Sequence, residues 1–508
     1  MYSRRQQGIC GADDRGTALK PTTPLSMLPL SGEEYTYFEW FKCKTLKKIP
    51  GMFVLGFWDS LLFQASMSEP AVLHAILTLS SVHKRDIVDP DNRSGSDAID
   101  QQERFMLQHY SKAISLLQPQ FLSRNRSSAR ITLIACVVFV CLEYLRGHFR
   151  TAQIHLQNGL RILREVQDCS SIKGDGMISL PTRYGSTDGY IDEAFHRLHT
   201  QVALFQQGYQ HFHFMPQEPC VSTPPVLVYH SINEAWTLMG QLLNSIFYLT
   251  EQSRLASSSS ALHKRQQVIQ SGLSQWLKTY EASKNQIQKS ERRHFDLLHT
   301  YYNMANIMSG ACLRPHDESM YDSYTDDFIT LLERATNVWK MKTDTMDSVS
   351  LALPGHQLNM SSSIVDIGWI PPLYYTALKC RVHRLRLHAI RLIESTSHRE
   401  GIWDAKIAAC VARKVMELEE GDFYKDIDIP DDFLLSSLPE VWELTKPSLP
   451  LSHRFQVVKV VLPDGPMDNL TLCLKQKLDE GSWKVLSKSY SIISRCWTDE
   501  ISKVDTEA

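Results

Sequence analysis

The stretch on either side of Gly147 constrains the fold more than any other part of the sequence. Two long apolar segments with helical spacing, 131–145 and 151–166, flank this glycine. The second segment carries its apolar residues on one helical face, at Ala152, Leu156, Leu160 and Leu163. A helix, a short turn and a second helix form an αα-hairpin, and several such units packed side by side give an all-helical array.

Helical spacing recurs along most of the chain after about residue 33. Ser68 followed by Pro70 predicts a helix start with Ser68 as its N-cap. That helix is expected to turn one face inward, with Leu73, Ile76, Leu77 and Ser80 on it. Further helices are predicted over 191–205, 231–249, 264–283, 292–308, 324–340, 373–393 and 401–419.

One more helix is predicted between residue 98 and Pro119, which is expected to end it because proline interrupts helical hydrogen bonding. Its apolar stripe comprises Phe105, Met106, Tyr110, Ala113, Ile114 and Leu117. Runs rich in glycine, serine, proline and aspartate interrupt the helical pattern and predict loops over 89–97, 169–189, 216–225 and 257–260.

The C-terminal part has a different pattern. Residues 454–462 and 470–475 have the composition of strands around a turn at 463–466, and 483–493 adds a candidate third strand. The sequence therefore predicts a mainly α fold, an irregular array of packed antiparallel helical hairpins, with a small C-terminal β-hairpin or sheet. The expected division is a flexible leader over 1–30, a helical domain over 31–440 and a β-containing appendage over 441–508.

Composition limits the classes of function. The chain has 54 Lys and Arg against 56 Asp and Glu, a balance that argues against extensive DNA contact but leaves room for a local basic patch. The 11 cysteines are scattered, and Cys136 and Cys141 lie in an apolar helical run, which is typical of reduced, buried thiols in an intracellular protein. The longest apolar run, 131–142, is shorter than a membrane span, so no membrane association is expected.

No catalytic, cofactor-binding or metal-ligating residue is predicted. Glycine-rich phosphate loops, His-Glu-x-x-His and Gly-x-Ser-x-Gly do not occur in the sequence. His196 and His199 share a helix face and His211 and His213 flank Phe212, but no third ligand is close in sequence, so structural histidines are the favoured interpretation.

Two charged clusters have competing interpretations. The acidic group Asp426, Asp428, Asp431 and Asp432 lacks the glycine and final glutamate of an EF-hand loop, and a solvated loop or weak activation element is favoured over a calcium site. The basic group Arg381, Arg384, Arg386 and Arg391 can either meet a phosphate backbone or form a solvated helix face, and the solvated face is favoured.

Several segments, in the same order along the chain, resemble the helical regulatory region of fungal zinc-binuclear-cluster transcription factors. They are residues 28–41, Gly51 to Phe53, Phe57 to Asp59, Ser68 to His83, Tyr144 to Leu160, Gly368 to Arg381 and His398 to Glu420. Within the last segment, Gly401 can turn the chain, Trp403 can anchor it and Asp404 is expected in the first turn of a helix.

The resemblance implies a nuclear regulator of RNA polymerase II transcription, tied to a pathway or a secondary-metabolite gene cluster. It implies a helical region that gates activity, forms a homodimer or receives co-regulators. Such factors also carry a six-cysteine module with two Cys-x-x-Cys pairs that hold zinc, and no Cys-x-x-Cys occurs here. Direct DNA binding is therefore doubtful, and the expected routes to DNA are a DNA-binding partner protein or a zinc-cluster exon upstream.

Two alternatives from other classes remain open at this point. A non-catalytic helical scaffold that assists a biosynthetic pathway fits the same pattern and the near-neutral charge. An enzyme is disfavoured because the motif search finds no catalytic constellation.

Overall fold

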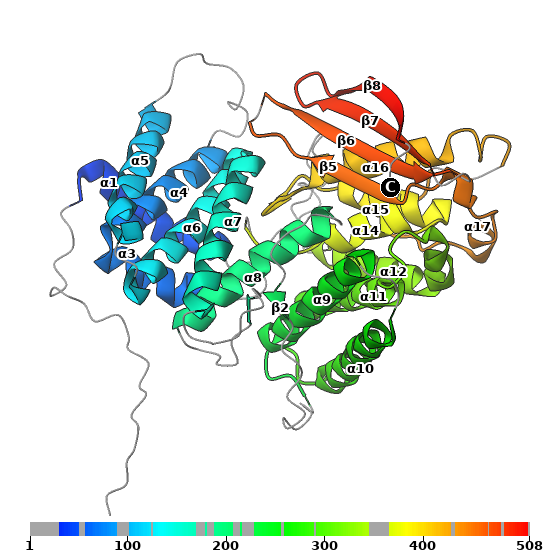
Figure 1. Cartoon of the computed structure of the whole chain (residues 1–508), viewed down its shortest axis with the longest axis horizontal. Coiled ribbons are helices and arrows are strands. Elements are labelled where there is room, and N and C mark those ends of the chain that lie inside the picture. Colours follow the sequence, from blue (N-terminus) through cyan, green and yellow to red (C-terminus); the bar gives the residue numbers. More distant parts are fainter. Residues whose placement is uncertain are drawn as a thin grey trace, which may run out of the picture.

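The structure is a computed structural model of the 508-residue chain, drawn in Figure 1. It describes residues 30–49, 56–88, 101–122, 125–168, 178–179, 187–206, 214–215, 228–255, 259–288, 291–344, 365–427, 432–465, 467–478 and 482–505. Residues 1–29 of the leader predicted over 1–30, the loop over 89–97, His211 and His213, and Asp428 and Asp431 lie outside the described residues.

Helices dominate the described part of the chain. The first half contains α1 (Gly32–Trp40), η1 (Phe41–Thr45), α2 (Leu46–Lys48), η2 (Phe57–Leu61), α3 (Leu62–Ser68), α4 (Pro70–Val88), α5 (Gln101–Leu122), α6 (Arg126–Arg146), α7 (Phe149–Asp168) and α8 (Thr187–Gln206). The second half contains α9 (Ile232–Leu255), α10 (Ser260–Ser283), α11 (Arg292–Ala311), η5 (Glu318–Tyr324), α12 (Thr325–Thr343), α14 (Ile370–Lys379), α15 (His383–Glu394), α16 (Ala405–Glu420), α17 (Val441–Leu444) and η6 (Leu451–His453).

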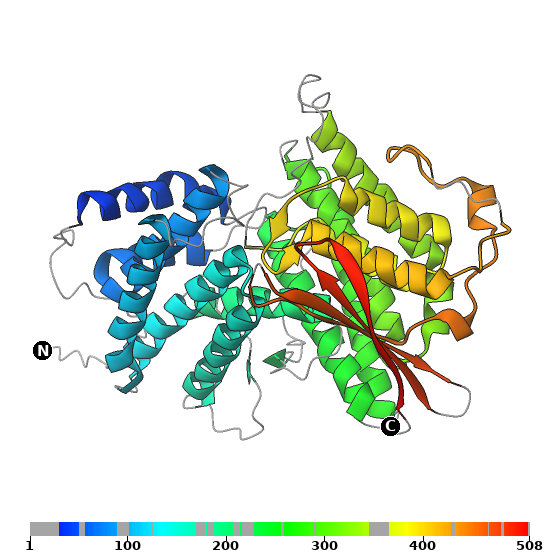
Figure 2. The ribbon, with the colours of Figure 1, turned by 90° about the horizontal axis from the view of Figure 1, so that it is seen from above.

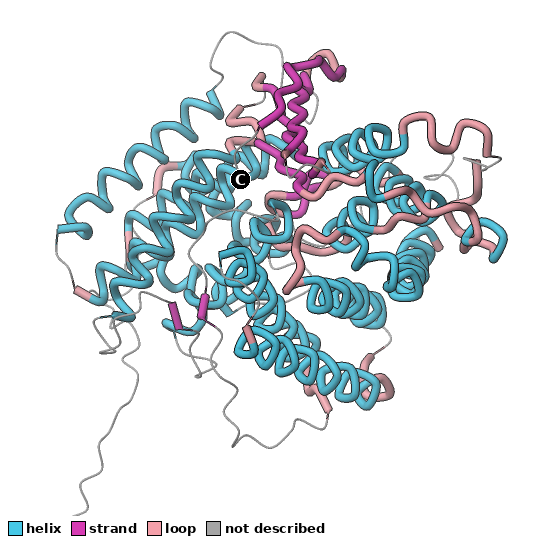
Figure 3. The backbone as a smooth tube through the Cα atoms, turned by 45° about the vertical axis from the view of Figure 1, so that its right-hand side comes forward, coloured by secondary structure: helices cyan, strands magenta, loops and turns pink. Residues whose placement is uncertain are grey.

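Strands form three separate sheets. The pairs β1 (Ile178–Ser179) with β2 (Phe214–Met215) and β3 (Arg399–Glu400) with β4 (Trp403–Asp404) are short. The third sheet is antiparallel and runs in chain order through β5 (Val457–Val461), β6 (Asn469–Lys477), β7 (Trp483–Ser491) and β8 (Cys496–Asp505). Figure 3 shows these four strands gathered at the top of the view, with helices on both sides of them.

The N-terminal helices pack around α6. This helix contacts α4, α5 and α7, and its residues from Ile131 to Leu145 are buried on every side. The predicted hairpin around Gly147 is confirmed, because α6 ends there with the glycine in the left-handed conformation at φ 78°. The face of α7 predicted to turn inward is buried as well.

One described helix, α6, is long and apolar enough to cross a membrane. It is longer than the apolar run that the sequence analysis considered, with a mean hydropathy of 1.9 in its most apolar window. However, 89% of that window is buried inside the molecule, as in the core helix of a globular protein.

Helix α8 lies between the two halves of the molecule. It contacts α6 and α7 on one side and α9 on the other. Figures 1 and 2 show the second half as a group of helices from α9 to α16, with the C-terminal sheet lying beside α16. Strand β6 alternates between inward and outward residues, and its inward side chains, Leu470, Leu472 and Leu474, are buried in the core.

The structure corrects several predicted boundaries near the start of the chain. Ser68 is the last residue of α3 and not the N-cap of the next helix, because Glu69 separates α3 from α4. Pro119 does not end α5, which accommodates the proline within its last turn and continues to Leu122. Ile114 does not belong to the buried stripe of α5, since it is 38% exposed.

Further corrections concern the second half. The single helix predicted over 373–393 is two helices, because Cys380 and Val382 adopt extended backbone conformations between α14 and α15. The helix predicted from Gly401 begins at Ala405, with Asp404 as its N-cap and a two-stranded hairpin before it. Strand β8 is absent from the prediction, whereas the three predicted strands are present.

Candidate functional site

The short hairpin of β3 and β4 joins segments from both halves of the molecule. Its turn residue Gly401 has φ 62°, a left-handed conformation that side chains disfavour. A Cβ at this position would lie 2.8 Å from the carbonyl oxygen of Val365 and would also collide with the Gln201 side chain. The Gln201 amide in turn donates to the Val365 carbonyl at 2.8 Å. Glycine is therefore required here by backbone conformation and by close packing.

Glu400 caps the N-terminus of α14. Its two carboxylate oxygens accept hydrogen bonds from the backbone amides of Gly368, Trp369 and Ile370 at 2.8 to 3.1 Å. The first amides of a helix lack partners within the helix, and a carboxylate there is also favoured by the helix dipole. His398 Nε2 lies 2.8 Å from Glu400 Oε1 and holds the carboxylate in place. The segment around residue 400 thus fixes the segment around residue 370.

Arg399 and Asp404 make a second set of contacts between the hairpin and neighbouring helices. Arg399 donates to Asp404 Oδ2 at 2.8 Å and to the carbonyl of Leu145 at the end of α6 at 3.1 Å. The other Asp404 oxygen accepts from the amides of Lys406 and Ile407 and caps α16. Burial alone would raise the pKa of Asp404, but the Arg399 guanidinium and these amides outweigh it and lower the pKa. Asp404 is therefore ionised at neutral pH.

Trp403 anchors the hairpin in the core, as predicted. It is fully buried, and its ring centroid lies 4.8 Å from that of Phe205 and 5.3 Å from that of Tyr374. Edge-to-face contacts of this kind are favourable for aromatic rings. Within the segment 400–404, Glu400, Gly401, Trp403 and Asp404 therefore all have structural roles.

For Arg381, Arg384 and Arg386, the predicted phosphate contact and the predicted solvated face are both wrong. Arg381, Arg384 and Arg386 are at most 3% exposed. Arg381 and Arg386 both donate to Glu419 at 2.6 Å, and Arg381 also pairs with Glu318. Lys379 also pairs with Glu318 and Arg386 also pairs with Glu420, while Arg384 forms a separate buried pair with Glu443.

Arg391 differs from these arginines because it is partly exposed. It lies over the ring of Phe433 at 4.4 Å and 3.7 Å from Asp432. Within the acidic cluster, Asp426 and Asp432 are exposed.

Among the described residues, the histidines and cysteines that the sequence singled out are buried in helices. His196 and His199 lie in α8, and His196 Nε2 is 3.0 Å from the Asn244 amide of α9. Cys136 and Cys141 are free thiols buried in α6, and burial raises the pKa of both well above its ordinary value. These positions fit the structural interpretation.

One group of candidate metal ligands appears in the structure that the sequence did not indicate. Glu34, His74 and His109 come from α1, α4 and α5, and each offers an atom within 4.8 Å of the others. His74 Nδ1 lies 2.9 Å from His109 Nδ1, which fits a hydrogen bond between two imidazoles. Burial, followed by the charge of Lys112, lowers the pKa of His74 to about 4. The pair is satisfied as neutral imidazoles, so the geometry does not require an ion.

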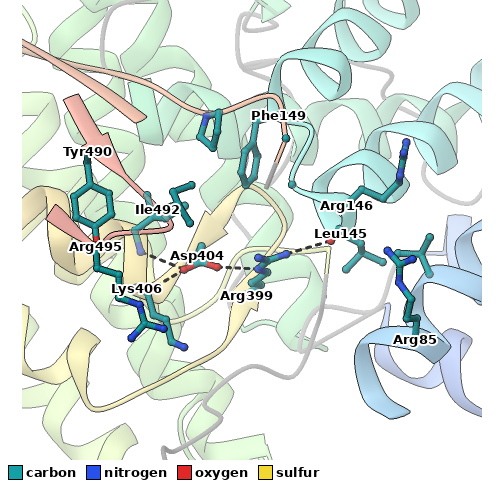
Figure 4. Close-up of a pocket in the computed structure, with 15 residues that line it drawn as sticks. Arg85, Leu145, Arg146, Phe149, Arg399, Asp404, Lys406, Tyr490, Ile492 and Arg495 are labelled. Atoms are coloured by element: carbon teal, nitrogen blue, oxygen red, sulfur yellow. Dashed lines mark hydrogen bonds and ion pairs between the residues drawn. The ribbon is translucent and has the colours of Figure 1, made fainter. Parts of the chain in front are cut away.

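A pocket of about 310 Å³ lies where the hairpin, the N-terminal helices and the C-terminal sheet meet (Figure 4). Helix α4 contributes Val82 and Arg85, and the corner between α6 and α7 contributes Leu145 to Gly147 and Phe149. The rest of the wall comes from Arg399, Asp404, Lys406, Ile407, Pro463, Gly465, Tyr490, Ile492 and Arg495.

The pocket is strongly cationic. Its lining holds five cationic residues and one carboxylate, Asp404. Arg85 pairs with Glu103, Arg146 with Glu143 and Arg399 with Asp404. Burial raises the pKa of Tyr490 to about 12, so its hydroxyl also remains a neutral hydrogen-bond donor. Guanidinium, ammonium and hydroxyl groups together suit the recognition of an anion.

Comparison with known proteins finds similarity in the N-terminal part of the helical body. The fungal specific transcription factor domain family matches residues 35–181. Over 150 residues, 28% of the chain, the protein is 33% identical to the aspercryptin biosynthesis cluster-specific transcription regulator atnN of Emericella nidulans. Over 108 residues, 20% of the chain, it is 26% identical to the transcription regulator lscL of Purpureocillium lilacinum.

These stretches span 23% and 25% of the two relatives. No solved structure matches the chain. The pocket wall formed by Val82 to Phe149 lies inside the matched residues, whereas the hairpin and the sheet lie outside them. The resemblance seen in the sequence is confirmed over residues 35–181, which match the fungal specific transcription factor domain family.

Proposed function

We propose that the protein regulates RNA polymerase II transcription in the nucleus and controls a biosynthetic gene cluster. The observation that carries the proposal is the match of residues 35–181 to the fungal specific transcription factor domain, together with a relative described as a cluster-specific regulator.

The route to DNA is part of the proposal. Arg381, Arg384 and Arg386, members of the basic cluster considered in the sequence analysis, are buried against glutamates and are not available for phosphate contacts. The nearly balanced charge of the chain points the same way. The regulator therefore reaches promoters through a DNA-binding partner protein or through a zinc-cluster segment encoded by an upstream exon. Mapping the transcript across the 5′ end of the gene separates these routes.

A tethered reporter assay tests the regulatory role. The full chain is fused to a foreign DNA-binding domain, and transcription from a matching reporter is compared with that of the DNA-binding domain alone. We expect a clear change in reporter transcription in either direction. A Gly401→Ala fusion, in which the hairpin is disrupted, serves as the matched control and should lose the effect at equal protein level.

The second candidate is a non-catalytic scaffold of a biosynthetic pathway, which the same helical body would suit. A fusion that is folded and nuclear but leaves reporter transcription unchanged would favour the scaffold over the regulator. A fluorescent fusion expressed from the native locus tests the nuclear location directly, and exclusion from the nucleus would contradict the proposal.

A further inference from the structure

Two cations of the pocket, Lys406 and Arg495, have exposed side chains that are open to a ligand from solution. Among the described residues, neither Lys406 nor Arg495 has an acidic side chain within 4.0 Å. Lys406 is the second residue of α16, where the helix dipole already presents its positive end. Figure 4 places both side chains on the same side of the pocket, next to the Asp404 carboxylate, whose two oxygens are already engaged.

Arg495 also has an unusual backbone. Among the described residues, Arg495 is the one residue other than glycine with a positive φ, which is 55°. The residue lies in the turn between β7 and β8, and its amide donates to the Ser491 carbonyl at 2.8 Å. Glycine would satisfy this turn without strain.

The pocket wall is assembled from segments that are distant in the sequence. Arg85 and Arg146 come from the N-terminal helices, Arg399 and Lys406 from the region around the hairpin, and Arg495 from the C-terminal sheet. A bound anion would therefore contact several separate parts of the fold at once. Its negative charge would balance Lys406 and Arg495, the two lining cations without a carboxylate partner among the described residues, and would link α16 to the turn between β7 and β8.

We propose that this pocket binds a small organic anion carrying carboxylate or phosphate groups, with Lys406 and Arg495 as its principal charge contacts. A cavity of about 310 Å³ admits a small metabolite and excludes a folded partner. The planar Arg495 guanidinium matches both carboxylate and phosphate geometry, and Lys406 supplies a point charge. The inference goes beyond the regulatory function, and it stands or falls independently of that function.

Binding is measured by isothermal titration of the purified full chain with citrate and, separately, with inorganic phosphate, with glycerol as the uncharged control. We expect saturable binding of at least one anion. The preferred anion then distinguishes a carboxylate from a phosphate ligand. Lys406→Gln should weaken binding about tenfold, the loss expected for one charge-assisted hydrogen bond. Lys414→Gln removes the same charge from the same helix at a residue paired with Glu417, and it should leave the affinity unchanged.

Arg495→Gly separates ligand binding from folding. Glycine relieves the strain at φ 55°, so the ligand-free variant should melt at the same temperature as the original chain or slightly higher, while its affinity for the anion falls. The proposal is overturned if neither anion binds saturably, or if Arg495→Gly and Lys406→Gln bind as tightly as the unchanged chain. A non-saturable thermal stabilisation that is equal in all variants would also overturn it, because phosphate stabilises proteins generally by exclusion from their surface.

Discussion

Asp464 caps the N-terminus of α7 from 313 positions further along the chain, with its Oδ1 accepting a hydrogen bond from the Thr151 amide at 2.9 Å. Next to it, the Pro463 carbonyl accepts from the Phe149 amide at 3.3 Å. Two of the unpaired amides that open α7 are thus satisfied by the loop between β5 and β6. The C-terminal sheet is thereby attached to the N-terminal helices at the rim of the pocket.

Asp464→Ala should lower the free energy of unfolding by about 1 kcal/mol, the usual cost of removing a helix cap. Urea denaturation followed by circular dichroism measures the change. Asp426→Ala, which removes the same group from an exposed position, is the control and should have little effect. Equal stability of the Asp464 and Asp426 variants would contradict the capping role.

Gly401→Ala should destabilise the protein more than Gly147→Ala does. Both glycines have positive φ, at 62° and 78°, but a Cβ at Gly147 would meet nothing within 4 Å, whereas at Gly401 it would meet the Val365 carbonyl. We expect a cost of about 1 kcal/mol at Gly147 and about 2–4 kcal/mol at Gly401. Chemical denaturation of the two variants side by side tests the difference, and similar costs would show that close packing at Gly401 is unimportant.

Glu419→Gln should cost about 3–5 kcal/mol, because it leaves Arg381 and Arg386 buried without their shared carboxylate. The matched control is Glu394→Gln, which breaks the exposed pair with Arg413 and should cost less than about 1 kcal/mol. Raising the salt concentration should reduce the effect of the control substitution but hardly that of Glu419→Gln. A strong salt dependence at Glu419 would argue against burial of the network.

His196 should make the protein less stable in mild acid. Burial, followed by the charge of Arg197, lowers the pKa of His196 from its ordinary 6.5 to about 4 in the folded protein. The unfolded chain therefore binds the proton more readily. The stability contributed by neutral His196 is complete above pH 6.5 and is lost as the pH falls towards 4.

The test is the pH dependence of the unfolding free energy between pH 7 and 5. As the pH falls, the unfolding free energy of His196→Gln should decline less steeply than that of the unchanged chain. The His263→Gln variant, changed at an exposed site on α10, should show the same decline as the unchanged chain. Part of the slope should remain in the first variant because burial also lowers the pKa of His74, His294, His299 and His388 to about 4.

The sequence predicts those features that depend on neighbouring residues. The hairpin around Gly147 follows from local apolar spacing and a glycine turn, and the anchoring role of Trp403 follows from its type and position. Burial of Arg381 does not follow from local sequence, because its partners Glu318 and Glu419 lie 63 and 38 positions away. The break between α14 and α15 is not predicted either, because the apolar helical spacing of the sequence continues across it.

The pocket was beyond prediction because its wall comes from segments between Val82 and Arg495 with no shared motif. Likewise, the approach of Glu34, His74 and His109 depends on how α1, α4 and α5 pack. The division into residues 31–440 and 441–508 stays a prediction, and so do the partner proteins.

The hydrogen bond from Arg399 to the Leu145 carbonyl limits where the protein can be truncated. A fragment that stops at residue 181, where the family match ends, would release α6 from Arg399 and α7 from Asp464. It would also uncover the surfaces of α6 and α7 that α8 covers. Bait fragments for interaction screens should therefore extend through β8. Shorter fragments would expose normally buried apolar surfaces and would bind proteins nonspecifically.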